Sequence, residues 1–146
     1  MKAFCWIFLL SSLCSAQELT VCVLNAKNRQ PLAKQTVTVQ YLNDKPPGAL
    51  SPVSLQADNH GEARFSLPSP LPGTVDVKVA LTSEHWHCAC WVMVETGKAL
   101  HDGFVQTAPS KSGKTVEAIT SKPGEVIIMA RPFTFGEKLL YPFVKE

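Results

Sequence analysis

Within residues 35–42, with the sequence QTVTVQYL, polar and apolar side chains alternate from Thr36 to Tyr41. In an extended chain this rhythm places Val37, Val39 and Tyr41 on one face and the polar side chains on the other. A second run, VDVKVAL at residues 75–81, has the same period of two. Such alternation is the signature of a half-buried β-strand. The two runs therefore predict an all-β protein.

Further runs of the same kind extend this pattern over the rest of the chain. They cover residues 19–24, 53–56, 62–67, 86–95, 115–120 and 125–130. The run at 86–95 is apolar on both faces, so we expect it to be a central strand. Turn-forming proline and glycine residues separate the runs, and only residues 96–104 suggest a helical turn. The spacing predicts an immunoglobulin-like or prealbumin-like antiparallel β-sandwich of about 7–8 strands.

The first 16 residues have the layout of a secretory signal peptide. Lys2 provides the positive start, an apolar run follows, and small residues precede a cleavage point after Ala16. The apolar run has about 11 residues, whereas a membrane span needs about 20. Lipidation at Cys14 is disfavoured, because Leu13 precedes it. The sequence therefore predicts a secreted or periplasmic protein that does not span the membrane.

Residues 17–146 have the length of one ordinary domain, and no internal repeat divides them. Their C-terminal tail, 133–146, is rich in apolar side chains. These are Phe133, Phe135, Leu139, Leu140, Tyr141 and Phe143. Because such a set would form an adhesive patch if it were exposed, we expect the tail to dock on the sandwich.

The charge of the chain argues against a nucleic-acid partner. The 14 basic and 12 acidic residues give a formal net charge of +2, and they are scattered without a basic block. A nearly neutral chain produces no long-range field that would attract nucleic acid. We therefore expect the partner to be another protein or a glycan.

Two motifs resemble a known family. Residues 28–33, NRQPLA, lie just before the strand predicted at 36–41, and DNHGEARF at 58–65 precedes a proline-glycine turn. Over residues 20–82 the chain is similar to the carboxypeptidase regulatory-like domain and to its transthyretin-like and collagen-binding B-type relatives. The resemblance implies a β-sandwich. It also implies a folding, spacing or ligand-binding module and not an enzyme, since family members commonly have these roles.

The densest cluster of reactive side chains is HWHCACW at residues 85–91. On an extended strand, His85 and His87 share one face with about 7 Å between them. Two imidazoles at that spacing could bind Cu²⁺ or Zn²⁺ with a third ligand, for which His60 and His101 are the candidates. The simpler interpretation is a solvated histidine face without a metal, so no cofactor is expected.

Three cysteines remain after removal of the signal peptide: Cys22, Cys88 and Cys90. On an extended strand the side chains of Cys88 and Cys90 lie about 7 Å apart, too far for a bond between them. A bridge from Cys22 to either one would close a loop of about 66–68 residues and stabilise the fold by about 4 kcal/mol. The alternative is three buried thiols. The unpaired thiol would also allow a disulfide-linked dimer.

The aromatic residues give the last candidate site. Trp86 and Trp91 point to opposite faces of an extended strand, so at most one of them is expected at the surface. An exposed tryptophan beside Tyr41 could stack on a sugar ring. The alternative is that both tryptophans pack internally. No catalytic motif is present. The sequence therefore predicts a non-catalytic binding or structural module that makes contacts through loops 43–52 and 101–114. A metal-binding protein and a carbohydrate-binding module are the alternatives.

Overall fold

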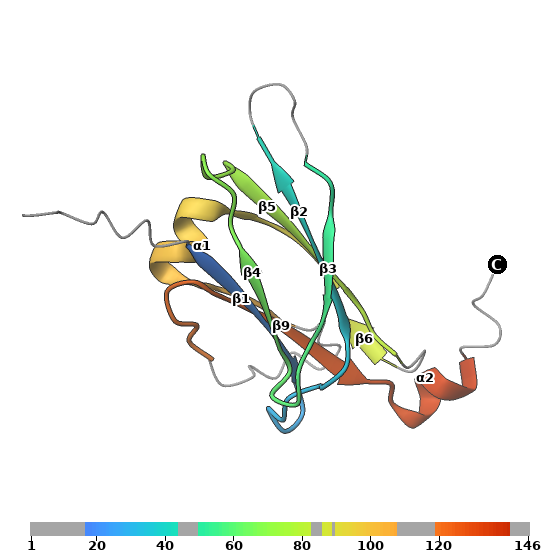
Figure 1. The fold of residues 1–146 in the computed structure, drawn as a ribbon. Coiled ribbons are helices and arrows are strands. Elements are labelled where there is room, and N and C mark those ends of the chain that lie inside the picture. The colour runs from blue at the N-terminus through green and yellow to red at the C-terminus, as the bar shows by residue number, and fades with distance from the viewer. Residues whose placement is uncertain (1–16, 44–49, 83–85, 89, 108–118, 141–146) are drawn as a thin grey trace, which may run out of the picture.

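The computed structural model describes residues 17–43, 50–82, 86–88, 90–107 and 119–140, and these form two packed β-sheets (Figure 1). Sheet A has the strand order β4-β1-β9-β6, with β8 also paired to β9. Its strands are β1 (Glu18–Asn25), β4 (Glu62–Ser66), β6 (Trp86–Cys88), β8 (Phe104–Gln106) and β9 (Glu125–Pro132). Sheet B has the order β3-β2-β5-β7. Its strands are β2 (Thr36–Leu42), β3 (Val53–Gln56), β5 (Thr74–Ala80) and β7 (Trp91–Glu95).

This architecture confirms the predicted all-β sandwich, but its strands are not uniformly antiparallel. All pairs in sheet B are antiparallel, whereas β1 and β8 both run parallel to β9. Parallel neighbours need a long crossover connection. The chain supplies it, because residues 107–124 separate β8 from β9, and most of the domain separates β1 from β9.

The core between the sheets has the residues that the alternating pattern predicted. Val37 and Val39 are fully buried and Tyr41 is nearly so, while their polar neighbours point away from the interior. They meet an equally apolar inner face of sheet A. Its largest buried members are Phe65, Leu19, Ile128, Val21, Val23 and Val126. Each fully buried side chain of this size contributes about 1.5–3 kcal/mol through removal of apolar surface from water.

The two sheets differ on their outer faces. Sheet A has a second buried cluster there, formed by Cys22, Ile127 and Met129. Strand β9 is therefore buried on both faces, and it is the central strand of sheet A. Sheet B instead turns polar side chains outward from β2 and β5. The outer face of sheet B is therefore accessible over several strands.

The prediction of one central strand over residues 86–95 is wrong. Residues 86–88 form β6 at the edge of sheet A, while residues 91–95 form β7 at the edge of sheet B. The chain thus crosses from one sheet to the other between them. In β7, Val92 and Val94 pack on the core while Trp91 and Met93 are exposed, so apolar residues occur at both parities although one face is buried.

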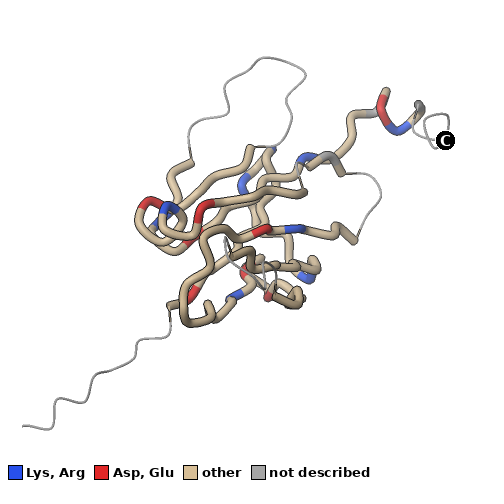
Figure 2. Tube along the Cα trace, turned by 90° about the horizontal axis from the view of Figure 1, so that it is seen from above, with Lys and Arg blue, Asp and Glu red and all other residues tan. Residues whose placement is uncertain are grey.

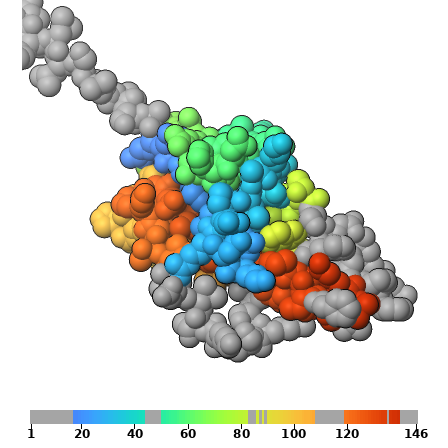
Figure 3. Space-filling model, turned by 90° about the horizontal axis from the view of Figure 1, so that it is seen from below, coloured from blue at the N-terminus to red at the C-terminus, as the bar shows by residue number. Residues whose placement is uncertain are grey.

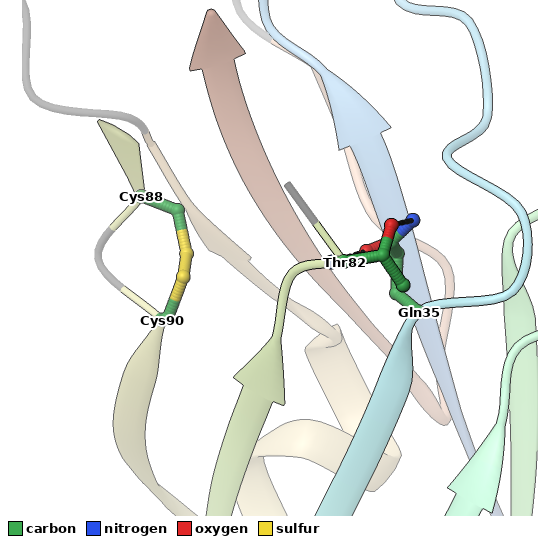
Figure 4. Close-up of a disulfide and its surroundings, with 4 residues drawn as sticks. All are labelled: Gln35, Thr82, Cys88 and Cys90. Atoms are coloured by element: carbon green, nitrogen blue, oxygen red, sulfur yellow. Dashed lines mark hydrogen bonds between the residues drawn. A yellow bond between two sulfur atoms is a disulfide. The ribbon is translucent and has the colours of Figure 1, made fainter. Parts of the chain in front are cut away.

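A disulfide joins Cys88 to Cys90 at this crossover (Figure 4). Their Cα atoms are 4.9 Å apart, inside the range of about 4.4–6.8 Å that a disulfide requires. The predicted bridge from Cys22 is wrong, because Cys22 is a free thiol buried on the outer side of sheet A. Cys90 packs instead against the core between the sheets. The estimate of 7 Å assumed an extended strand, which the crossover interrupts.

The size of the closed loop makes this pairing testable. A bridge between residues two positions apart should stabilise the fold by only about 1.5 kcal/mol in the loop-entropy model. A bridge from Cys22 would stabilise it by about 4 kcal/mol. We therefore expect the Cys88→Ser, Cys90→Ser double variant to lose about 1.5 kcal/mol in urea denaturation. A loss near 4 kcal/mol, or a non-reduced peptide map that links Cys22, would contradict the pairing.

Gln35 is a buried polar residue at the start of β2 whose amide is fully used (Figure 4). Its Nε2 donates to the Ala33 carbonyl oxygen at 2.8 Å and to Thr82 Oγ1 at 3.3 Å. Its Oε1 accepts from the Thr82 N–H at 2.8 Å. These bonds offset the cost of burying an amide and join the start of β2 to the chain that leaves β5.

The predicted helical turn is present as α1 (Thr96–Asp102), which follows β7 directly. It ends at Gly103, whose N–H donates to the Ala99 carbonyl oxygen at 3.1 Å. A second helix, α2 (Phe135–Leu140), lies beyond the end of β9 and forms one end of the molecule (Figures 1 and 3). Neither helix of the described chain has the length and apolar character that a bilayer crossing requires.

One half of a capping box and an ion pair hold α2. Glu137 accepts from the N–H and the Oγ1 of Thr134 at 2.8 and 3.0 Å, and the bond to the Thr134 N–H is the one that a glutamate three positions later makes in a capping box. Arg131 at the end of β9 donates to both Glu137 oxygens at 2.9 Å. Leu139 is exposed, and residues 141–146 lie outside the described chain. Docking of the whole tail on the sandwich therefore stays a prediction.

The ion pair has a defined pH dependence. Arg131, and then the Thr134 N–H, lower the pKa of Glu137 well below its ordinary value of 4.5. A lowered pKa means that the stabilisation is complete above pH 4.5 and is lost only as the pH falls toward the folded-state pKa. We expect NMR signals of α2 to stay unchanged from pH 7 down to pH 4.5. Titration of Glu137 at its ordinary pKa would contradict this.

Candidate functional site

The structure describes the histidines of the predicted metal site only in part. His85 and the side chain of His87 lie outside the described residues. His60 is exposed in the turn before β4 and His101 is exposed on α1, where its Nδ1 lies 2.6 Å from Asp102 Oδ1. No group of three metal-ligating side chains occurs among the residues that are described. The Cu²⁺ or Zn²⁺ site therefore stays a prediction.

The three aromatic candidates lie in different environments. Tyr41 is 5% exposed, and its hydroxyl donates to the Ser66 carbonyl oxygen at 3.1 Å. It therefore links the two sheets from inside, which corrects its predicted place beside a surface tryptophan; burial also raises its pKa. Trp86 is half-buried in β6. Trp91 is 59% exposed on β7 and is the one candidate with a largely accessible ring.

Strand register assembles a surface around Trp91. Lys78 of β5 lies opposite Trp91, and Thr38 of β2 lies opposite Lys78. In the next row on the same side, Met93 lies opposite Asp76, and Asp76 lies opposite Gln40. We call these six residues of sheet B the Trp91 face.

The local sequence explains why this face is mixed in character. Val92 and Val94 point toward the core, so Trp91 and Met93 must point outward from the same edge strand. Met93 is 57% exposed, nearly as much as Trp91. Two large apolar side chains, side by side on an otherwise polar sheet face, are typical of a recognition surface.

Asp76 has an unsatisfied oxygen. Its Oδ1 is buried and has no hydrogen-bond partner among the described residues. Buried polar atoms are normally paired, so this oxygen needs a donor. Asp76 lies in the middle of its row, between Gln40 and Met93.

A hollow lies between the edges of the two sheets, next to β3 and β4. It is a cavity of about 560 Å³ lined by Tyr41, Leu50, Ser51, Val53, Leu55, Arg64, Phe65, Ser66 and Pro68. Arg64 is the one charged residue in that lining, and it forms an exposed ion pair with Glu62 at 3.0 Å. The described lining of this hollow is mainly apolar and includes no pair of titratable groups suited to acid–base catalysis.

The strongest pKa shifts have structural causes. Burial, and then the hydrogen bond to Glu125 Oε1 at 3.2 Å, raise the pKa of the Cys22 thiol to about 12. Arg131 lowers the pKa of Glu137. Neither Cys22 nor Glu137 lines the cavity or belongs to the Trp91 face. The physical causes of these two shifts are burial for Cys22 and ion pairing for Glu137.

Sequence analysis identified Trp91 but missed Met93, Asp76 and Lys78. Alternation in the run at 75–81 already placed Asp76 and Lys78 on one polar face. The alternation did not show that Trp91 and Met93 lie beside these two residues. That neighbourhood requires the pairing of β5 with β7, and β7 reaches sheet B only because the chain changes sheets at Cys88 and Cys90.

Comparisons with known proteins give limited information. No protein-family model matches the chain, and no curated protein sequence matches it. Among solved structures, the full-length major pilin SpaD from Corynebacterium diphtheriae is similar, with 11% sequence identity and a TM-score of 0.49. The match covers 80% of this chain and 30% of the pilin chain. At this level of similarity no role of the pilin is transferred to this chain.

Proposed function

We propose that this chain is an exported, non-catalytic β-sandwich module that recognises a partner through the Trp91 face. The observation that carries the proposal is the exposure of Trp91 and Met93, 59% and 57%, at adjacent outward positions of β7. Exposed tryptophan and methionine side chains are enriched where proteins bind partners. A sheet face also presents them on rigid elements, which limits the entropy lost on binding.

Export is supported by two independent features. Residues 1–16 have the layout of a signal peptide. The disulfide between Cys88 and Cys90 is of a kind that persists in oxidising compartments and is rare in the cytosol. Both features favour a secreted or periplasmic protein. The resemblance to the carboxypeptidase regulatory-like domain over residues 20–82 is part of the proposal, since such domains serve as binding or spacing modules.

The test uses a protein of residues 17–146. It measures how much of this protein is retained on cell-envelope material from the producing organism. We expect Trp91→Ala and Met93→Ala each to reduce retention, because each removes an exposed apolar contact. Leu71→Ala is the matched control, since Leu71 is 45% exposed but lies outside the Trp91 face. Circular dichroism should be unchanged in all three variants, because exposed positions contribute little to stability. Retention that neither Trp91→Ala nor Met93→Ala alters would contradict the proposal.

A further inference from the structure

We infer that the disulfide between Cys88 and Cys90 is a reversible redox switch, and that its reduction releases β6 from the edge of sheet A. Three observations support the inference: the bridge joins the two sheets, it closes a very short loop, and both cysteines are half-buried. The inference concerns the crossover between the sheets, so it does not depend on the proposed binding role of the Trp91 face.

The bridge links the edge of one sheet to the edge of the other. Cys88 is the last residue of β6 and lies opposite Ala130 of β9 in sheet A. Cys90 directly precedes β7, and its carbonyl oxygen accepts from the Val79 N–H of β5 in sheet B at 2.8 Å. Figure 4 shows the bond at the point where the chain passes between the sheets. The disulfide therefore ties the end of β6 to sheet B.

Strand β6 has few other interactions that hold it in place. It has three residues, and among the described strands it pairs only with β9. Its Trp86 is half-buried and belongs to neither of the two described core clusters. A short edge strand with few buried apolar contacts opens at a low free-energy cost. Strand β7 differs, because Val92 and Val94 pack on the core between the sheets. Loss of the bridge should therefore free β6 and leave β7 in place.

The short loop means that the fold does not require the bond. Closure of a loop between residues two positions apart contributes only about tenfold to the folding equilibrium constant in the loop-entropy model. The fully buried core is formed mainly by other strands, namely β1, β2, β5 and β9. The reduced chain should therefore stay folded, as a reversible switch requires.

A reductant can reach the bond from solvent. Cys88 and Cys90 are half-buried, whereas the free thiol of Cys22 is buried. Figure 2 shows basic and acidic positions interspersed along the described trace, so the charge of a small thiol should matter little for its approach. Access to the two sulfur atoms is therefore the main requirement for the reaction.

The reaction is a two-electron exchange with an external dithiol. One thiolate of the dithiol attacks the sulfur of Cys88 or Cys90, which breaks the bond, forms a mixed disulfide and releases the other cysteine as a thiolate that takes up a proton. The second thiolate of the dithiol then attacks the mixed disulfide and releases the remaining cysteine, which is also protonated. The protein gains two electrons and two protons, while the dithiol becomes a disulfide.

The test is backbone hydrogen–deuterium exchange on residues 17–146, oxidised or reduced with dithiothreitol in the absence of denaturant. We expect exchange at residues 86–88 to rise by at least about tenfold on reduction, while amides of β2 and β5 keep their protection. The Cys88→Ser, Cys90→Ser variant should show the fast exchange with or without dithiothreitol. Cys22→Ala is the matched control, because it keeps the bridge and should respond to dithiothreitol as the wild-type chain does.

Tryptophan fluorescence gives a second measurement. Two of the three tryptophans, Trp86 and Trp91, remain in residues 17–146, and they lie on either side of the bridge in the sequence. Their emission should change on reduction and return to its starting value after reoxidation by glutathione disulfide. The double serine variant should show neither change.

Three results would overturn the inference. The bond resists dithiothreitol until urea unfolds the chain, or reduction leaves exchange at residues 86–88 unchanged, or β2 and β5 lose their protection together with β6. The proposed function is judged separately, since retention that depends on Trp91 and Met93 is measured on the oxidised protein.

Discussion

Gly103→Ala is expected to lower the free energy of unfolding by about 3 kcal/mol. Gly103 ends α1 with φ 73° and ψ −178°, a backbone conformation that is almost restricted to glycine. A Cβ atom at this position would also overlap the Lys122 carbonyl oxygen and the side chain of Ser121. Because the first of these is backbone, no change of rotamer relieves the overlap, and the turn before β9 must move.

Gly97→Ala is the matched control in the same helix. A Cβ atom at Gly97 meets no other atom within 4 Å, and alanine favours a helix over glycine by up to about 1 kcal/mol. Urea denaturation should therefore give an unchanged or slightly higher stability for Gly97→Ala and a large loss for Gly103→Ala. Equal effects of the two substitutions would show that the strain at Gly103 is not the cause.

The sequence predicted the strands well and their arrangement only in part. Runs such as 35–42 and 75–81 became β2 and β5 almost without change, because their alternation is imposed by one buried face. The period of two does not state which sheet a strand joins. For this reason residues 86–95 looked like one strand that is buried on both sides, although they belong to two sheets.

The same limit applies to the candidate site. Trp91 is exposed because it lies on the edge strand of sheet B. An outward-facing side chain on a central strand can instead be buried, as Ile127 and Met129 of β9 are. Tyr41 shows the reverse case, since it shares its face with Val37 and Val39 and is buried with them. The alternation in the sequence therefore showed which residues share a strand face. The pairing of strands and the packing of the two sheets decided which of these faces reach solvent.

Cys22 is expected to resist thiol reagents in the native protein. Its pKa of about 12 lies roughly three units above the ordinary value, so at pH 8 the reactive thiolate is about a thousandfold less populated than in an exposed cysteine. Burial slows the reaction further, because the reagent must also reach the sulfur. At pH 8 an aromatic disulfide reagent should thus react with Cys22 of the folded protein at least about a thousandfold more slowly than with an exposed cysteine. Unfolding of the chain should remove this protection.

The same measurement identifies the free cysteine. If Cys22 were bridged to Cys88 or Cys90, the leftover thiol would lie at the half-buried crossover between the sheets and would react much faster in the native state. For residues 17–146, slow native labelling, followed by labelling of one thiol per chain in urea, therefore supports a buried Cys22, which is also poorly placed for a disulfide-linked dimer. Glu125→Gln removes the carboxylate that accepts the thiol hydrogen bond, but burial is the larger cause of the raised pKa. We expect this variant to recover only a minor part of the reactivity, and full recovery would show that the carboxylate, not burial, protects the thiol.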